Sequence, residues 1–292
     1  RQSLGVLAAG DQILALGGFA HTDGGGRAQV SGFTYIPKSN TWNVAFCLPE
    51  PRTQFGFANA AGSFWVLGGI DYAPDRKGRE FVFPATVLRW DGTSSSFAAS
   101  SSALPRPRRA FGCAVQNGRI WLVGGMREEF EPVPEVDVFD PATSTWTTGP
   151  SPTNTRISPF LLAVGDSLVL AGGSVAQDVG NEPARTLAVL RSGSDTWQEL
   201  DLPIEPPLLG AVVWRQRLFC LCLTLGRTVV AWRRSSTLAV FQLVPIGSTS
   251  PLTCHNYPAW TSIAVTFLAL VSPTSSLTTK AKRYASWRWS LN

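Results

Sequence analysis

Residues 108–125 read RRAFGCAVQNGRIWLVGG, and this stretch decides the fold. Arg108 is followed four positions later by Gly112 and sixteen positions later by a Gly-Gly pair at 124–125. Between these markers, GCAV and RIWLV read as two short strands, and the Asn-Gly dipeptide at 117–118 that joins them is a strong signal for a two-residue hairpin turn. The stretch therefore predicts an antiparallel strand pair that ends at two glycines.

The same arrangement occurs four times in the first 200 residues. In each copy an apolar run precedes a Gly pair, and an Arg stands sixteen positions before the first Gly of that pair. The pairs are Gly17-Gly18, Gly68-Gly69, Gly124-Gly125 and Gly172-Gly173, and the arginines are Arg1, Arg52, Arg108 and Arg156. The copies are 51, 56 and 48 residues apart. Such a period indicates a repeat architecture, in which each unit buries its apolar faces against its neighbours.

Each copy also contains an outer hairpin, formed by two large residues separated by six residues of turn chemistry. These pairs are Tyr35/Trp42, Trp90/Phe97, Phe139/Trp146 and Leu190/Trp197. Each unit therefore reads as four short antiparallel strands. We expect Trp42, Trp146 and Trp197 to be structural residues that pack against the next sheet, because no unit can cover its own apolar faces.

The Arg, the Gly-Gly after an apolar strand and the Tyr/Phe-x6-Trp pair together resemble the kelch repeat, the four-stranded blade of a kelch β-propeller. A degenerate fifth copy follows, in which Pro206 replaces the Arg, Cys222-Leu223 replaces the Gly pair, and Trp232 and Phe241 are expected to close the outer hairpin. The resemblance implies an all-β, six-bladed propeller with blades at about 1–50, 51–106, 107–154, 155–204, 205–250 and 251–292. Residues 251–292 lack the repeat markers, so a sixth blade and a non-kelch tail both remain open.

Composition agrees with an all-β chain. Of the 292 residues, 44% are hydrophobic and only 15% are charged, against about 25% charged in typical soluble proteins. The 27 Gly, 21 Pro and 11 Trp disfavour a helical bundle, a coiled coil and a disordered chain. The net charge of +5 comes from residues 201–292, which carry +7, whereas residues 1–200 carry −2.

The basic residues near the C-terminus suggest two kinds of partner that we do not favour. Lys280, Lys282, Arg283 and Arg288 are interleaved with Tyr284, Trp287 and Trp289. This mixture is found in surfaces that bind nucleic acid or anionic membranes. A degenerate end of the repeat gives the same composition, so we expect neither a nucleic-acid nor a membrane partner.

The cysteines and apolar runs indicate a compartment. Five scattered cysteines do not form a disulfide framework, so we expect a reducing compartment, cytoplasmic or nuclear. The longest apolar run, 263–271, is far shorter than the ~20 residues that span a bilayer. The chain opens at Arg1 without a Met, which suggests a propeller that is part of a larger protein.

The sequence contains little evidence for a catalytic site or a metal site. The two histidines, His21 and His255, have no supporting triad motif, and no helix-forming segment follows any Gly pair, so the pairs are not phosphate loops. Cys220, Cys222 and Cys254 with His255 do not have a recognised zinc spacing. We therefore expect no metal, no cofactor and no enzyme, although galactose-oxidase-like and mutarotase-like kelch enzymes remain an alternative.

Loop lengths point to a partner-binding face. The loops between the second and third strands, at 19–30, 70–82, 126–135 and 174–185, are long, and they share one face with the loop that enters the first strand of each blade. Long loops on a rigid scaffold commonly carry binding residues. The candidate partner-binding residues are Arg52, Arg108, Arg109, Arg156, Arg27, Tyr72, Arg76 and Arg127.

The repeated arginines have two interpretations. They are scaffold residues that bind backbone carbonyls between blades, or they line the mouth of the central channel at Arg52, Arg108 and Arg156. A ring of guanidinium groups would bind a short acidic or phosphorylated peptide, because guanidinium matches carboxylate and phosphate oxygens.

Resemblance to BTB-kelch (kelch-like) proteins implies a function. In that family the propeller recognises substrates for a cullin-RING E3 ubiquitin ligase, and the cullin binds through a BTB domain, which lies outside this chain. The alternatives are a kelch scaffold in cytoskeletal or trafficking complexes and the kelch-type enzyme.

Overall fold

The computed structural model describes residues 1–22, 25–77, 80–176, 181–201, 208–214, 217–222, 228–232 and 238–242. Apart from one 3-10 turn, η1 (Glu128–Phe130), the regular elements of these residues are β-strands. Contacts divide the chain into two units, Arg1–Pro207 and Leu208–Asn292. The described part contains no helix with the length and apolar character needed to span a membrane.

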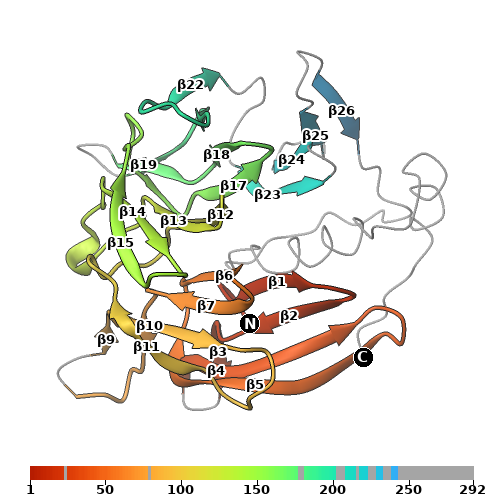
Figure 1. Ribbon diagram of the computed structural model, residues 1–292, viewed down its shortest axis with the longest axis vertical. Coiled ribbons are helices and arrows are strands. Elements are labelled where there is room, and N and C mark those ends of the chain that lie inside the picture. The colour runs from red at the N-terminus through yellow and green to blue at the C-terminus, as the bar shows by residue number, and fades with distance from the viewer. Residues whose placement is uncertain are drawn as a thin grey trace. The chain divides into compact units, whose positions relative to one another are not determined.

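Four larger antiparallel sheets form the framework of the first unit, and we call them blades 1 to 4 (Figure 1). Blade 1 comprises β1 (Gly5–Ala9), β2 (Gln12–Leu16), β4 (Gly25–Ile36) and β5 (Thr41–Arg52), and blade 2 comprises β6 (Gly56–Ala60), β7 (Ser63–Leu67), β10 (Thr86–Trp90) and β11 (Ala98–Ala103). Blade 3 comprises β12 (Gly112–Gln116), β13 (Arg119–Val123), β14 (Val136–Asp140) and β15 (Thr145–Gly149), and blade 4 comprises β17 (Phe160–Val164), β18 (Ser167–Ala171), β21 (Thr186–Leu190) and β22 (Gln198–Asp201). Each blade corresponds to one copy of the repeat, which confirms the expected four-stranded unit.

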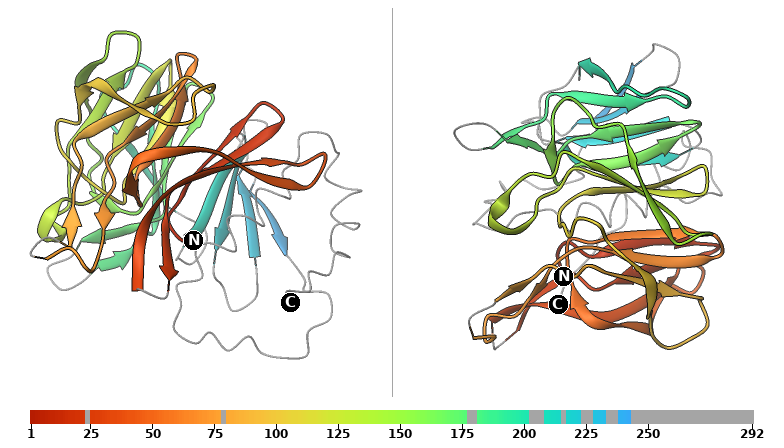
Figure 2. Two further views of the ribbon diagram at one scale, coloured as in Figure 1. Left: turned by 90° about the horizontal axis from the view of Figure 1, so that it is seen from below. Right: turned by 60° about the vertical axis from the view of Figure 1, so that its left-hand side comes forward.

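Short extra strands occur in the loops between the second and third strands of three blades and, for β16, in the segment that enters blade 4. They are β3 (Phe19–Thr22), which pairs with the start of β4, the hairpin of β8 (Asp71–Tyr72) and β9 (Phe81–Val82), and the small sheet of β16 (Arg156–Ile157), β19 (Ser174–Ala176) and β20 (Asn181–Pro183). The β8–β9 hairpin and η1 gather at the same end of the blades (Figure 2, left). We call this end the long-loop face.

The opposite end of the blades carries tight turns. In blade 3, Asn117 and Gly118 connect β12 to β13 with φ of 51° and 74°. Both values are positive, as a type I′ hairpin turn requires, and Asn-Gly is the dipeptide that adopts them most readily. The turn predicted from the sequence is therefore present.

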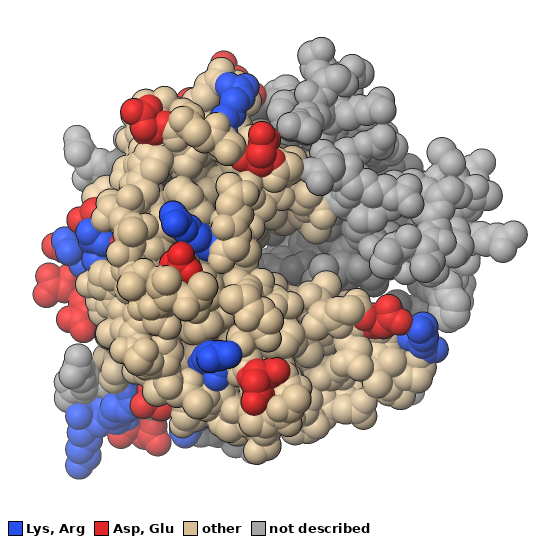
Figure 3. All heavy atoms as spheres, in the orientation of Figure 1, with Lys and Arg blue, Asp and Glu red and all other residues tan. Residues whose placement is uncertain are grey.

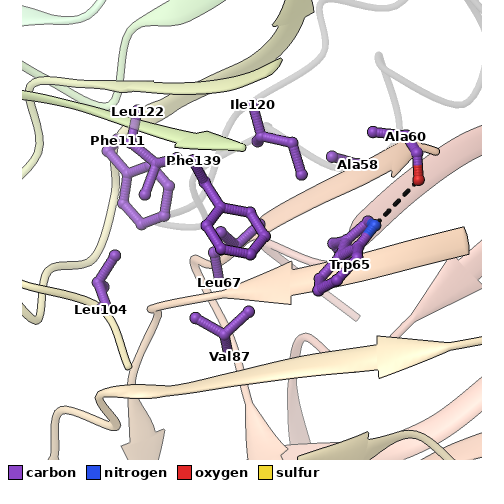
Figure 4. Close-up of a cluster of buried hydrophobic side chains, with 10 residues drawn as sticks. All are labelled: Ala58, Ala60, Trp65, Leu67, Val87, Leu104, Phe111, Ile120, Leu122 and Phe139. Atoms are coloured by element: carbon purple, nitrogen blue, oxygen red, sulfur yellow. Dashed lines mark hydrogen bonds between the residues drawn. The ribbon is translucent and has the colours of Figure 1, made fainter. Parts of the chain in front are cut away.

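The core lies between the blades. The second strand of blade 3 buries Ile120 and Leu122 completely, and these residues pack with Trp65 and Leu67 of blade 2 (Figure 4). The ring of Trp65 meets that of Phe139 edge to face with centroids 5.1 Å apart. A strand that is apolar on both faces fits this position, because a neighbouring sheet covers each side.

The outer hairpins have the predicted register, since Tyr35 lies opposite Trp42 and Phe139 opposite Trp146. Trp146 packs on the preceding blade rather than the next one, and its Nε1 donates to Ser102 Oγ at 2.8 Å. Trp42 is 54% exposed, so its predicted packing against a neighbouring sheet is wrong for the described residues. Blade 1 has no preceding blade within the first unit.

The second unit contains the degenerate fifth copy. Its strands are β23 (Leu208–Trp214), β24 (Arg217–Cys222), β25 (Thr228–Trp232) and β26 (Leu238–Gln242), which pair in chain order. Trp232 lies opposite Leu238, and Phe241 lies opposite Val229, so the expected closing pair of Trp232 and Phe241 is wrong. Only five residues separate the two strands, which places Leu238 directly across from Trp232. The expected sixth blade at 251–292 lies outside the described residues.

Candidate functional site

The repeated arginines are part of the blade framework. Arg108 is fully buried, and its Nη1 donates to the carbonyls of Gly124 at 3.1 Å and Glu135 at 2.8 Å. These carbonyls lie at the end of the second strand and just before the third, so one guanidinium holds both strands where the long loop begins and ends. The equivalent acceptors are Gly17 and Ser31 for Arg1, Gly68 and Thr86 for Arg52, and Gly172 and Thr186 for Arg156.

This placement corrects the hypothesis that Arg52, Arg108 and Arg156 line the mouth of a channel. The three side chains have no exposed surface, so they cannot contact a partner. The contacts match the interpretation of these arginines as scaffold residues, with one difference in the carbonyls that they bind. Each guanidinium binds carbonyls of the repeat copy that its own Arg opens, and for Arg52, the last residue of β5, these carbonyls lie in blade 2.

The arginines differ in their acidic partners. Arg108 pairs with the buried Asp137 at 2.5 Å, and Arg156 pairs with Glu199 at 3.0 Å. Among the described residues, Arg52 forms an ion pair only with the exposed Glu50, at 3.9 Å, and its Nε and Nη2 make no hydrogen bond. Loss of hydration lowers the pKa of Arg52 and of Arg108 to about 10, so both remain charged at neutral pH.

The Gly pairs join neighbouring blades through the main chain of these arginines. The N–H of Gly125 donates to the carbonyl of Arg156 in the next blade at 2.8 Å, and a Cβ on Gly124 would lie 2.2 Å from that oxygen. Gly124 also has a φ of 71°, which L-residues rarely adopt. The same hydrogen bond joins Gly18 to Arg52 and Gly69 to Arg108.

A row of backbone hydrogen bonds crosses the blades at the long-loop face. It involves the residue two positions after each repeated Arg: Ser3, Gln54, Ala110 and Ser158. The N–H of each of the last three donates to the carbonyl of the one before it, at 2.7 to 3.0 Å. All four residues have a left-handed φ between 50° and 56°. The backbone next to the long loops is therefore hydrogen-bonded from one blade to the next.

Aromatic side chains connect the loops of blades 1 and 2. Tyr72 packs between Phe19, with ring centroids 5.8 Å apart, and Phe81, at 4.8 Å. His21 meets the other side of Phe19 edge to face at 5.2 Å. The predicted residue Tyr72 is thus the centre of an aromatic row that runs toward blade 3.

Most of the predicted basic residues on this face are already paired. Arg27 contacts Asp75 at 3.5 Å, Arg76 contacts Asp71 at 2.5 Å, and Arg127 contacts Glu131 at 2.6 Å. On the face drawn in Figure 3, basic and acidic side chains likewise lie close to one another. The charges of these three side chains are therefore neutralised by neighbouring carboxylates.

A hollow of about 500 Å³ lies between the long loops of blades 2 and 3. Its lining residues are Ile70, Phe81, Phe83, Arg109, Arg127, Glu128, Glu129 and Phe130. Phe81 is 49% exposed and Phe130 is 71% exposed. Glu129 and Phe130 have φ of 58° and 63°, an arrangement that costs roughly 1–2 kcal/mol per residue. Backbone strain that holds an aromatic ring out in solvent points to function rather than to folding.

Arg109 is one of the charged residues that line the hollow. Its Nη1 donates to Gln54 Oε1 of blade 2 at 2.7 Å, and its guanidinium carbon lies 5.2 Å from the ring centroid of Phe130. Within the described ranges its Nε has no hydrogen-bond partner and no carboxylate lies within 4 Å of the guanidinium. Of the predicted residues, only Arg109 and Arg127 reach the hollow, and Arg109 is the one without an acidic partner.

The apolar residues that line the hollow were not predicted from the sequence: Ile70, Phe81, Phe83 and Phe130. The available signal was aromatic residues inside loops that are otherwise polar, such as Phe130 within MREEFEPVPE. The described residues contain no group of three or more His, Cys, Asp or Glu side chains that could hold a metal ion.

Known proteins resemble this chain in its repeat. The Kelch motif family model matches residues 107–153, the third copy. An F-box/kelch-repeat protein of Arabidopsis thaliana is 28% identical over 171 residues, which cover 55% of this chain and 44% of the relative. Kelch-like protein 34 of Homo sapiens is 26% identical over 196 residues, covering 66% and 29%. The chain thus spans less than half of the length of either relative.

The solved structure of YjhT superposes with a TM-score of 0.70 at 14% identity, and the match covers 83% of this chain and 84% of that one. This likeness shows the fold. The chain is an all-β kelch-repeat domain of the β-propeller type, and it resembles the kelch-like proteins.

Proposed function

We propose that this kelch-repeat propeller is a protein-interaction module whose partner binds at the long-loop face. The observation that carries the proposal is the hollow between blades 2 and 3, where exposed Phe81 and Phe130 stand on loops anchored by a buried framework. Aromatic side chains on rigid supports provide much of the binding energy in protein interfaces. The kelch-like and F-box/kelch-repeat relatives support the same reading.

The finer proposal is that the module recognises substrates for ubiquitination. In this view the propeller, in the cytoplasm or nucleus, captures a protein that a cullin-RING ligase then modifies, and the cullin binds through a BTB domain outside this chain. The resemblance to kelch-like proteins supports it, as does the greater length of the relatives. The names of the F-box/kelch-repeat relatives also place kelch repeats in one protein with a second module.

Affinity capture tests the interaction. The full chain carrying Phe81→Ser with Phe130→Ser is expected to lose the proteins that the unaltered chain retains from a lysate. Val44→Ser is the matched control, because Val44 is 77% exposed on the outer strand β5. Circular dichroism and a thermal melt would verify that both variants are folded. Equal capture by the double variant and the control would overturn the proposed binding face.

Co-precipitation tests the adaptor role separately. The full-length protein is expected to bring down a cullin, and a captured partner should accumulate ubiquitin when the two are expressed together. Partner capture without any cullin would refute the adaptor role while leaving the interaction module intact.

A further inference from the structure

We propose that the partner inserts an uncharged aromatic side chain into the hollow between blades 2 and 3, where it packs between Phe81 and Phe130. This inference rests on the proposed function, since it specifies the chemistry of the partner at the same site. It follows from an interrupted row of aromatic rings on the long loops and from the balance of charge around the interruption.

The aromatic row of blades 1 and 2 ends at Phe81. Tyr72 lies between Phe19 and Phe81, with ring centroids 5.8 Å and 4.8 Å away. Tyr72 supports one side of Phe81, whereas 49% of Phe81 is exposed and lines the hollow. Phe83 and the buried Ile70 extend this apolar lining. The last ring of the row therefore has a surface that the described residues leave uncovered.

Phe130 presents a second ring to the same hollow from the loop of blade 3. It is 71% exposed, and the guanidinium carbon of Arg109 lies 5.2 Å from its ring centroid. Phe81 and Phe130 make no ring contact with each other, although both line the hollow. A partner side chain that packs on both rings would remove apolar surface of each from water.

The charges that line the hollow favour a neutral side chain. Among the described residues, Arg109 has no acidic partner, and the carboxylate of Glu129 has no ion pair or hydrogen bond. Arg127 pairs with Glu131, and Glu128 is not free either. An acidic side chain in the hollow would be attracted by Arg109 but repelled by Glu129, and a basic one would experience the reverse. Either would also lose hydration among aromatic rings, which one attraction offset by one repulsion does not restore.

An aromatic side chain gains more from this lining than an aliphatic one. Aromatic rings attract one another in offset-stacked and edge-to-face arrangements beyond what the burial of area provides. The guanidinium of Arg109, which also lines the hollow, attracts the face of a ring. An aliphatic side chain of the same size would gain only from the burial of area. We therefore expect the partner to place Phe, Tyr or Trp in the hollow.

Selection from a library of random linear peptides displayed on phage, with the full chain immobilised, tests this inference. We expect the enriched peptides to share Phe, Tyr or Trp at one position, without a common charged residue. Selection on Phe81→Leu with Phe130→Leu, which keeps apolar side chains but removes the rings, should accept aliphatic residues at that position. The control is Trp42→Leu, which removes a 54% exposed ring from the outer strand β5 and should enrich the same peptides as the unaltered chain.

A pair of fluorescent peptides sharpens the test. One copy of an enriched peptide carries Phe at the shared position, and the other carries cyclohexylalanine, which has a saturated ring of similar size. The second copy should bind the unaltered chain about threefold to tenfold more weakly, because the attraction between aromatic rings is lost. The two copies should bind the double variant equally, and circular dichroism would verify that this variant is folded. If it is not, the comparison on the unaltered chain decides alone.

Equal binding of the two copies to the unaltered chain would overturn the inference. Enriched peptides that share an aliphatic or charged residue instead of an aromatic one would do the same, and loss of the peptides on Trp42→Leu would place the recognition outside the hollow. A selection that enriches nothing would also overturn it, whereas capture of whole proteins that depends on Phe81 and Phe130 would then still support the proposed function.

Discussion

Arg108 and Arg109 are neighbours in the sequence with opposite surroundings. The side chain of Arg108 turns inward to two carbonyls and Asp137, whereas that of Arg109 reaches the hollow beside Phe130. Successive side chains of an extended backbone point to opposite sides, which is why one arginine serves the fold and the next is available to a partner. The repeat position identifies the first of these residues but gives no information about the second.

Replacing the buried arginine is expected to destabilise the protein strongly. Arg108→Met should lower the free energy of unfolding by about 3 kcal/mol, because two carbonyls and the buried Asp137 lose a donor. Arg52→Met should cost less, since among the described residues its ion pair is with the exposed Glu50 and the buried Asp71 acts on it only from a longer distance. Arg119→Met, at an exposed ion pair, should cost less than about 1 kcal/mol. Urea unfolding of the three variants measures this order, and a loss at Arg108 no larger than that at Arg119 would contradict it.

Cys113 provides a probe of the packing between blades 2 and 3. Burial raises the pKa of its thiol to about 12, so the thiol remains protonated at neutral and mildly alkaline pH. Because the thiolate is the reactive form, we expect iodoacetamide to modify Cys113 only after unfolding in urea. Peptide mapping by mass spectrometry would follow this residue separately from the other cysteines. Rapid modification in the folded protein would show that the blade interface is open.

At the scale of the element, each blade is held to the next by the Gly pair and the Arg carbonyl. This contact explains why the spacing of sixteen residues is kept while the loop that follows varies in length. The Arg must reach the first Gly of its own blade, and the second Gly must reach the Arg carbonyl of the next. The loops between the second and third strands have no such constraint.

Gly118 and Gly124 have similar φ angles, but only Gly124 lies against a neighbouring blade. Replacing each of them by Ala therefore separates the cost of backbone strain from the cost of a steric clash. Gly118→Ala should cost about 1–2 kcal/mol, the expense of a left-handed φ, because no atom lies within 4 Å of the added Cβ. Gly124→Ala has the same type of φ but places its Cβ 2.2 Å from a backbone oxygen of the next blade. It should therefore cost at least about 1 kcal/mol more, as the hydrogen bond from Gly125 is disturbed. Equal losses in chemical denaturation would show that this contact does not hold the blades together.

The sequence predicts the strands, turns and residue pairs within one repeat. It does not predict features that depend on the contact between two repeats or on the length of a turn. The four-stranded blade, the Asn-Gly turn and the opposed Phe139 and Trp146 follow from residues close in the chain. The exposure of Trp42 depends on which blade precedes it, and the register of Phe241 depends on the length of a turn, so both expectations were wrong.

The candidate site shows the same limit. Arg109 and Arg127 are identified because they are charged and lie in or beside long loops, but the hollow itself brings together residues that are up to 60 positions apart. Its apolar lining has no repeat position that would mark it. The repeated arginines are well marked, yet their pattern fits a scaffold and a binding ring equally well. Only their burial distinguishes the two roles.

At the scale of the first unit, stability and binding belong to different residues. The buried arginines, the Gly pairs and the core between blades hold the fold, whereas the hollow is built on exposed loop residues. Phe130→Gly should therefore change the free energy of unfolding by less than about 1 kcal/mol, since relief of the left-handed φ offsets the lost ring contact with Arg109. The same change should remove partner binding. A large loss of stability in thermal unfolding would place Phe130 in the framework instead.

Hydrogen–deuterium exchange of the protein with and without a captured partner tests the central claim most directly. If the long-loop face is the binding surface, the partner should slow exchange in residues 70–83 and 126–131. Exchange should stay unchanged in the tight turns at the opposite end, at 9–12, 60–63, 116–119 and 164–167. Protection confined to those turns, or to the outer strand at 41–46, would contradict the account.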